Sequence, residues 1–187
     1  MNEAAKTNDP CMNAIALMFC LCCRVGEIES LHWSDVDFNK KNIHIWSEIR
    51  CEKKDGHLIY IEVPYTKSGK ADGDRFLNLS PRAISILRHV QKKNPFGKYI
   101  FLNQHGGTLR TSYIDRKLKQ LCNSAGVIYH SSHKIRFWSV SAEARMGMDL
   151  ETIRRNAGHS DSNTTLHYIR DIDSKAVNDT YWDSIYN

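Results

Sequence analysis

The chain has 187 residues, 41% hydrophobic and 25% charged, which is the balance of one globular domain and excludes a largely disordered protein. Its formal net charge of +5 mildly favours polyanionic partners, although many proteins without nucleic-acid partners carry as much. The longest apolar run, residues 11–23, is too short to cross a bilayer, and the polar first ten residues contain no signal-peptide core. We therefore expect a cytoplasmic protein that does not contact a membrane.

The six cysteines predict neither a disulfide framework nor a metal site. Three of them, Cys20, Cys22 and Cys23, crowd one apolar segment, where helical geometry would point them in different directions. A zinc site needs two spaced pairs of ligands, and these cysteines do not form such a set. We expect reduced, mostly buried thiols and no cofactor.

In the first half of the chain the hydrophobic period changes from helix to strand. Apolar residues predict a buried helix over 13–24 and a short second helix over 27–31. Strand-like alternation follows over 43–49, and the segments 58–63 and 75–79 continue it. We expect these three strands to form one small antiparallel sheet.

The second half is predicted to be helical, with recognisable helix ends. Ser80 precedes a proline and predicts a capped helix start, and Thr111 predicts the cap of a helix that stops at Gly126. Another helix is expected over 132–146. Further expected helix ends are Asp149, Gly158 and Asn163. The expected fold class is α+β, mainly α-helical with one small three-stranded antiparallel sheet.

Basic side chains that suit a phosphate group recur at expected helix ends and faces. His133 and Arg136 are three residues apart on an expected helix, so both could meet one anion, or could be ordinary surface residues. Arg24 follows a strongly apolar helix, where its guanidinium would face either a ligand or the nearby Glu27. The residue types alone leave these alternatives open.

His159 and Tyr168 complete the set. His159 follows a glycine that would end a helix, and Tyr168 comes nine residues later on an expected helical turn. The chain has eight tyrosines, so only position singles out Tyr168. Two arginines, two histidines and one phenol are what a metal-free enzyme would need to hold a phosphodiester and attack it.

At these positions the chain resembles the catalytic domain of the tyrosine recombinase (phage integrase) family, most of all the integrases of conjugative transposons. The matching boxes are Arg24-Val-Gly-Glu27, Thr66-Lys67-Ser-Gly-Lys70, His133-Lys-Ile-Arg136, Ala157-Gly158-His159 and Thr164-Thr165-Leu-His-Tyr168. Two departures are Lys134, where an aspartate is common, and Phe137-Trp138, where a His-Thr pair is common. Neither position supplies an essential group in the family.

The resemblance implies a site-specific recombinase that cleaves and rejoins DNA through a 3′-phosphotyrosyl intermediate, for integration or excision of a mobile element, without metal or ATP. The catalytic residues that it implies are Arg24, Lys67, His133, Arg136, His159 and Tyr168, with Tyr168 as the nucleophile. His133 would accept the phenol proton, Lys67 or its neighbour Lys70 would protonate the leaving oxygen, and Glu27 would hold Arg24.

The resemblance also bears on domains and partners. Residues 1–187 would be a catalytic domain without the N-terminal core-binding and arm-binding domains that family members usually carry. Double-stranded DNA is the expected partner, and the apolar tail 173–187 is expected to dock on a neighbouring subunit. The alternatives are type IB topoisomerase-like nicking and resealing, a non-catalytic DNA-binding regulator of a full-length recombinase, and a metal-dependent nuclease. The last would need carboxylates near the histidines, which the sequence does not supply.

Overall fold

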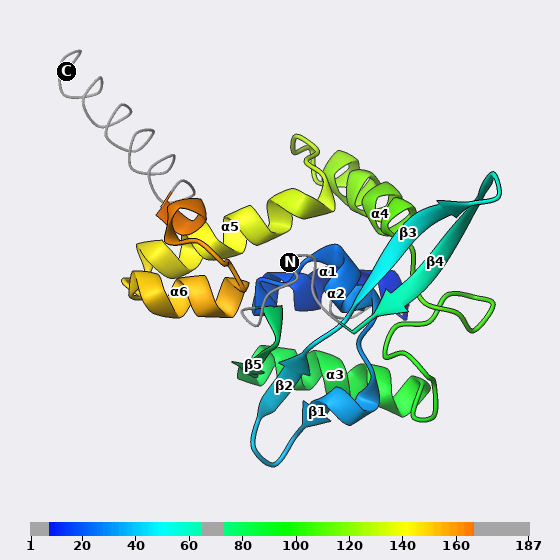
Figure 1. Cartoon of the computed structure of the whole chain (residues 1–187), viewed down its shortest axis with the longest axis horizontal. Helices are drawn as coiled ribbons and strands as arrows, with labels where there is room; N and C mark the ends of the chain where they lie inside the picture. The colour runs from blue at the N-terminus through cyan, green and yellow to red at the C-terminus, as the bar shows by residue number, and fades with distance from the viewer. Residues whose placement is uncertain (1–7, 65–72, 167–187) are drawn as a thin grey trace.

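The computed structural model describes residues 8–64 and 73–166 (Figure 1). The helices are α1 (Pro10–Leu21), α2 (Val25–Glu29), the short 3-10 helix η2 (Trp33–Asp35), α3 (Pro81–Lys93), α4 (Thr111–Ser124), α5 (Ser132–Arg145) and α6 (Leu150–Ala157). The strands are β1 (Val36–Asp37), β2 (Asn42–Ile45), β3 (Glu48–Lys54), β4 (His57–Val63) and β5 (Arg75–Asn78). Within the described residues, no helix is long and apolar enough to cross a membrane.

Helix α1 forms the centre of the core, and α3, α4 and α5 pack around it (Figure 1). Most residues of α1 are buried, and they lie on every face of the helix, as expected for a helix without a polar face. Asp9 caps its start by accepting the Cys11 N–H at 2.9 Å, and Cys22 ends it in the left-handed conformation, with φ 53°. The predicted buried helix is confirmed, with both ends three residues earlier than expected.

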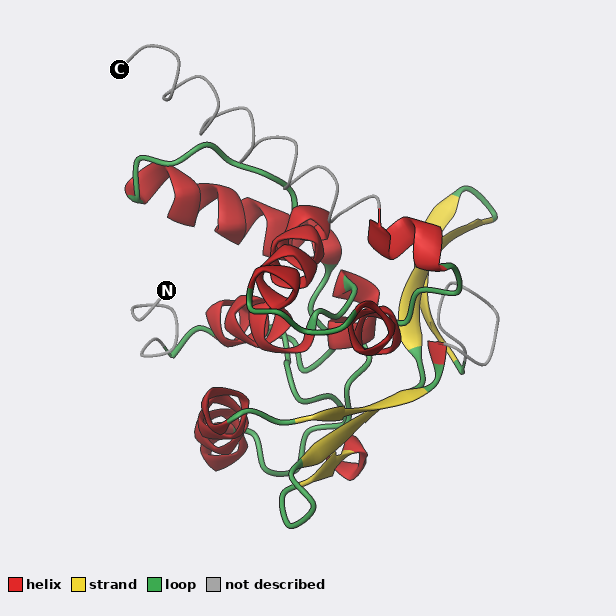
Figure 2. Cartoon of the chain, turned by 90° about the vertical axis from the view of Figure 1, so that its left-hand side faces the viewer, coloured by secondary structure: helices red, strands yellow, loops and turns green. Residues whose placement is uncertain are grey.

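The strands form two sheets instead of one. β1, β2 and β5 make a three-stranded antiparallel sheet in which Ile43 lies opposite Leu77. β3 and β4 make a separate antiparallel hairpin, with Arg50 opposite Ile61, and Figure 2 shows most helices gathered to one side of the strands. The expected three-stranded sheet is confirmed, but the predicted strand over 58–63 belongs to the hairpin, and β1 takes its place.

The sheets separate because the chain leaves strand geometry at Trp46 and Ser47. The indole Nε1 of Trp46 donates to Asp35 Oδ1 at 2.9 Å, and the Ser47 carbonyl accepts the hydroxyl of Ser30 at 2.8 Å. These two contacts tie the chain to η2 and to the end of α2. The single strand predicted over 43–49 therefore divides into β2 and β3.

Most of the predicted helix ends are confirmed. Ser80 Oγ accepts the Ala83 N–H at 3.2 Å at the start of α3, and Asp149 Oδ1 accepts the Thr152 N–H at 2.9 Å at the start of α6. Gly158 ends α6 with φ 61°, a conformation that favours glycine. Helices α4 and α5 agree with their predicted spans to within two residues.

Two predicted caps are wrong. Thr111 is the first residue of α4, and its hydroxyl donates to Glu29 Oε1 at 2.6 Å because a buried carboxylate of α2 lies beside it. Asn163 lies inside the helical segment 162–166, where its own N–H donates to Asp161 Oδ1 at 2.9 Å. Aspartate, rather than the predicted asparagine, thus starts that helix.

The start of α5 is fixed by a neighbouring helix. Asp115 of α4 accepts the backbone N–H of Ser132 at 2.7 Å, which satisfies one of the free N–H groups at the helix start. In Figure 1, α5 lies beside α1 and leads to α6, which packs against β5. Helix α2 packs against β3, and α5 packs against both α1 and α6.

Candidate active site

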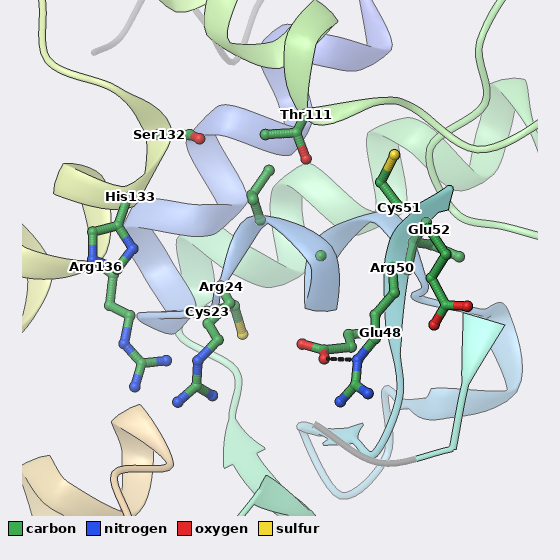
Figure 3. A pocket seen from close by; sticks show the side chains of 13 residues that line it. Cys23, Arg24, Glu48, Arg50, Cys51, Glu52, Thr111, Ser132, His133 and Arg136 are labelled. Carbon is green, nitrogen blue, oxygen red and sulfur yellow. Dashed lines mark hydrogen bonds and ion pairs between the residues drawn. The ribbon is translucent and has the colours of Figure 1, made fainter. Parts of the chain in front are cut away.

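A cavity of about 580 Å³ opens between α2, β3 and the first turns of α4 and α5 (Figure 3). Three predicted site residues line it: Arg24 from the start of α2, and His133 and Arg136 from α5. The two α5 residues face the same cavity, as their spacing predicts. Figure 3 shows the guanidinium groups of Arg24 and Arg136 extending in the same direction.

Arg136 is the most unusual of these residues. It is 3% exposed, and its Nη1 and Nη2 atoms have no hydrogen-bond partner within the described residues. Burial, and then the positive charge of Arg24, lowers the pKa of Arg136 to about 10. A buried donor without an acceptor costs free energy, and here one fork carries two. The arrangement suits an anion that is not part of the described chain.

Arg24 is held in place by Glu27, which is fully buried. Glu27 Oε1 accepts Arg24 Nη1 at 2.9 Å, and Oε2 accepts the backbone N–H of Arg24 at 2.8 Å. Burial by itself would raise the pKa of Glu27, but the charge and hydrogen bonds of Arg75, followed by the charge of Arg24, lower it to about 2. The carboxylate is therefore ionised at neutral pH and orients the Arg24 guanidinium.

Arg75 on β5 is a site residue that the sequence interpretation missed. Its Nη1 and Nη2 atoms donate to Glu27 Oε1 and Oε2 at 3.1 and 2.9 Å. Nη1 also donates to the Gly73 carbonyl at 3.0 Å, and Nε donates to the Asn156 carbonyl at 2.8 Å. Its position could have been inferred, because Arg75 lies two residues before Leu77 and so on the same face of β5, which points into the core.

His159 lies directly after α6 and is 4% exposed. Its Nδ1 atom is 2.8 Å from Thr165 Oγ1, and its carbonyl accepts Arg154 Nη1 at 2.7 Å. Burial, and then the charges of Arg136 and Arg24, lowers the pKa of His159 to about 3. The imidazole is therefore neutral at physiological pH. It lines a smaller cavity of about 300 Å³ beside β5 and α6 instead of the larger one.

A hydrogen bond links the wall of the larger cavity to the turn that carries His159. Arg24, which lines the larger cavity, donates from Nη2 to the carbonyl of Gly158 at 3.2 Å, one residue before His159. Lys67, Lys70, Tyr168 and the tail 173–187 lie outside the described residues. The structure thus brings together Arg24, His133 and Arg136, and places His159 next to them.

The cluster carries more positive than negative charge. The guanidinium groups of Arg24 and Arg75 both bind the carboxylate of Glu27, and Arg136 stands beside them. Planar guanidinium groups with free N–H forks bind phosphate oxygens in pairs. A phosphodiester therefore fits the charge and the donors of this site.

Comparison with protein families establishes the family of this chain, because the model of the phage integrase family matches residues 1–175. The chain belongs to the phage integrase family. Tyrosine recombinase XerC of Chlamydia trachomatis is 30% identical over 169 residues, covering 90% of this chain and 48% of the relative. The integrase of Staphylococcus phage L54a is 26% identical over 150 residues, covering 76% of this chain and 42% of the relative. The chain thus spans about half the length of the curated relatives it matches.

Solved structures of an integrase and a recombinase share the fold. The Tn1549 transposon integrase in complex with circular intermediate DNA matches 84% of this chain and 54% of its own, with a TM-score of 0.72 and 18% identity. XerA recombinase matches 89% of this chain and 54% of its own, with a TM-score of 0.69 and 22% identity. The predicted family and the predicted fold class are both confirmed.

Proposed function

We propose that this chain is the catalytic domain of a site-specific DNA recombinase that cleaves and rejoins strands through a 3′-phosphotyrosyl intermediate, in the integration or excision of a mobile element. The observation that carries the proposal is Arg136, whose buried Nη1 and Nη2 atoms lack a partner within the described residues and lie in a cavity shared with Arg24. That fork, together with Arg24, matches the non-bridging oxygens of a phosphodiester.

Arg24 and Arg136 would bind those oxygens and stabilise the charge that develops on them as a fifth oxygen approaches phosphorus. His159, kept neutral by its low pKa, can donate one further N–H to the same charge. If the Thr165 hydroxyl donates to Nδ1, that N–H is on Nε2. His133, at the rim of the cavity, would accept the proton of the attacking phenol.

The resemblance assigns the nucleophile to Tyr168 and the general acid to Lys67. The Tyr168 oxygen would bond to phosphorus, the bond from phosphorus to the 5′ oxygen would break, and Lys67 would protonate that oxygen. Thr165, three residues before Tyr168 in sequence, is buried and hydrogen-bonded to His159, which supports this placement. The phosphotyrosyl ester keeps the energy of the phosphodiester, so a second 5′-hydroxyl can reverse the attack without ATP.

The proposal extends to the partners. Double-stranded DNA would be the substrate, the tail 173–187 would dock on a neighbouring subunit, and the reaction would take place in the cytoplasm. Two solved structures that share this fold, a Tn1549 transposon integrase and a lambda integrase dimer, contain bound DNA. Gel mobility of the chain on a duplex with two sites, with and without the tail, tests the self-association.

The function is tested with a nicked suicide duplex bearing the recognised site. We expect a protein–DNA adduct that resists SDS, and we expect Tyr168→Phe to abolish it because the phenol oxygen is the attacking atom. Tyr113→Phe on α4 is the matched control and should form the adduct at the wild-type rate. The adduct should also form in the presence of a metal chelator.

Three outcomes would count against the proposal. Absence of an adduct from folded wild-type protein on a bound duplex would favour a non-catalytic DNA-binding regulator. An adduct that persists in Tyr168→Phe would refute the assigned nucleophile. An adduct without exchange between two duplexes, together with relaxation of supercoiled DNA, would favour topoisomerase activity.

A further inference from the structure

Arg75 connects three segments that the proposed reaction needs. Arg75 is 8% exposed, and all three nitrogens of its guanidinium donate to described acceptors. The acceptors are the carboxylate of Glu27, the carbonyl of Asn156 at the end of α6, and the carbonyl of Gly73. Glu27 holds Arg24, Asn156 lies three residues before His159, and Gly73 lies six residues after Lys67 in the sequence.

These contacts close into a ring. Arg75 binds Glu27, Glu27 binds Arg24, and Arg24 Nη2 donates to the carbonyl of Gly158 at 3.2 Å. Gly158 in turn packs against Arg75, since a Cβ atom at this position would lie 2.9 Å from Arg75 Nη1. A shift of any one member therefore moves the turn that leads into His159.

Stability alone is a poor explanation for this ring. Burying an ion pair costs desolvation that its attraction often only offsets, so an apolar residue of similar size would stabilise a core as well. What such a pair provides is a fixed geometry, because a planar guanidinium with several acceptors has one orientation. The desolvated charge of Arg75 is thus better explained by the positions that it fixes.

We propose that Arg75 is a positioning residue, which aligns Arg24, the turn before His159 and the backbone at Gly73 before DNA binds. The inference rests on the proposed function and extends it to a residue that does not touch the substrate. Misplacement of a reacting group by about 1 Å can slow a reaction by about 10²-fold. Arg75 should therefore govern the rate of cleavage and not the affinity for DNA.

The test compares Arg75→Lys with wild type in single-turnover cleavage at saturating suicide duplex. Lysine keeps the charge beside Glu27, but one ammonium cannot reach the acceptors on three segments. We expect DNA affinity within about 2-fold of wild type and cleavage slowed by about 10²-fold. Arg88→Lys on α3, where Arg88 lies over the ring of Phe38, is the matched control and should cleave at the wild-type rate.

Two further measurements separate positioning from a general loss of structure. The effects of Arg75→Lys and Glu27→Gln should be strongly non-additive, because both act through the orientation of Arg24. Methylguanidinium added to Arg75→Ala should restore part of the cleavage rate by refilling the vacated site, and should not affect Arg88→Ala. If Arg75→Lys or Arg75→Ala does not fold, the result from the other variant tests the positioning role.

The inference fails if Arg75→Lys cleaves as fast as wild type, or if its defect disappears at saturating DNA. It also fails if folded Arg75→Ala gains nothing from methylguanidinium. Failure of the proposed function is distinguishable, since wild-type protein would then form no adduct at all.

Discussion

Replacing Arg136 with methionine should make the DNA-free protein more stable and at the same time slow strand cleavage by about 10²–10³-fold. The charged guanidinium is buried without a partner in the described part of the chain, and its pKa is lowered to about 10. Relative to an ordinary value of 12.5, that shift corresponds to roughly 3 kcal/mol of unfavourable interaction at neutral pH. Methionine removes the charge and keeps much of the volume, so we expect a gain of about 1–3 kcal/mol.

Cleavage is slowed for a different reason, which applies only when DNA is bound. The same fork is the best-placed donor for the transition-state charge, and removal of one such donor costs about 10²–10³ in rate. Urea denaturation measures the stability and adduct formation measures the rate. Inorganic phosphate should raise the melting temperature of wild type and not that of Arg136→Met, because only wild type offers the anion a site.

Arg136→Lys is the matched control, since it keeps a buried charge and loses the fork. We expect it to lack the gain in stability and still cleave poorly. A large loss of stability in Arg136→Met would show that the guanidinium has a partner in the folded protein, which would contradict our interpretation of the site.

Lys67 should be dispensable when the leaving atom is sulfur. On ordinary DNA we expect Lys67→Ala to slow adduct formation by about 10²–10⁴-fold, the usual contribution of a general acid. On a duplex with sulfur in place of the scissile 5′ oxygen, the rate should return close to that of wild type. A thiol has a pKa near 8.5, so a thiolate leaves without prior protonation.

Lys70→Ala is the matched variant, three residues further along the sequence, and should cleave both duplexes normally. The opposite result, with Lys70→Ala impaired and rescued by sulfur, would assign the acid to Lys70. Arg136→Met should not be rescued, because its defect concerns the non-bridging oxygens. A Lys67→Ala defect that sulfur leaves unchanged would exclude Lys67 as the proton donor.

Much of the fold is readable from the chain because its hydrogen bonds are local. Asp9, Ser80 and Asp149 each accept an N–H two or three residues further on, so a short window of sequence contains the whole interaction. The spacing of His133 and Arg136 likewise places both on one face of α5 without help from the rest of the molecule.

Strand pairing was less predictable. The alternation over 43–49 continues across Trp46 and Ser47, and nothing local reveals that Asp35 and Ser30 draw these residues out of the strand. Pairing depends on which segments meet, and that is settled by packing and not by propensity. The sequence pattern therefore predicted a three-stranded sheet with one strand wrongly assigned.

The sequence by itself determined the family, the order of helices α1 to α6, and the positions of the boxes that carry Arg24, His133, Arg136 and His159. Only the tertiary structure decided how they are held. Arg75 is 48 residues from Glu27 and 81 residues from Asn156 in the sequence. No local sequence pattern extends over such separations. The low pKa of His159 has the same origin, as does the fork of Arg136, which has no partner among residues 8–64 and 73–166. Burial and neighbouring charges arise only when the segments are packed together.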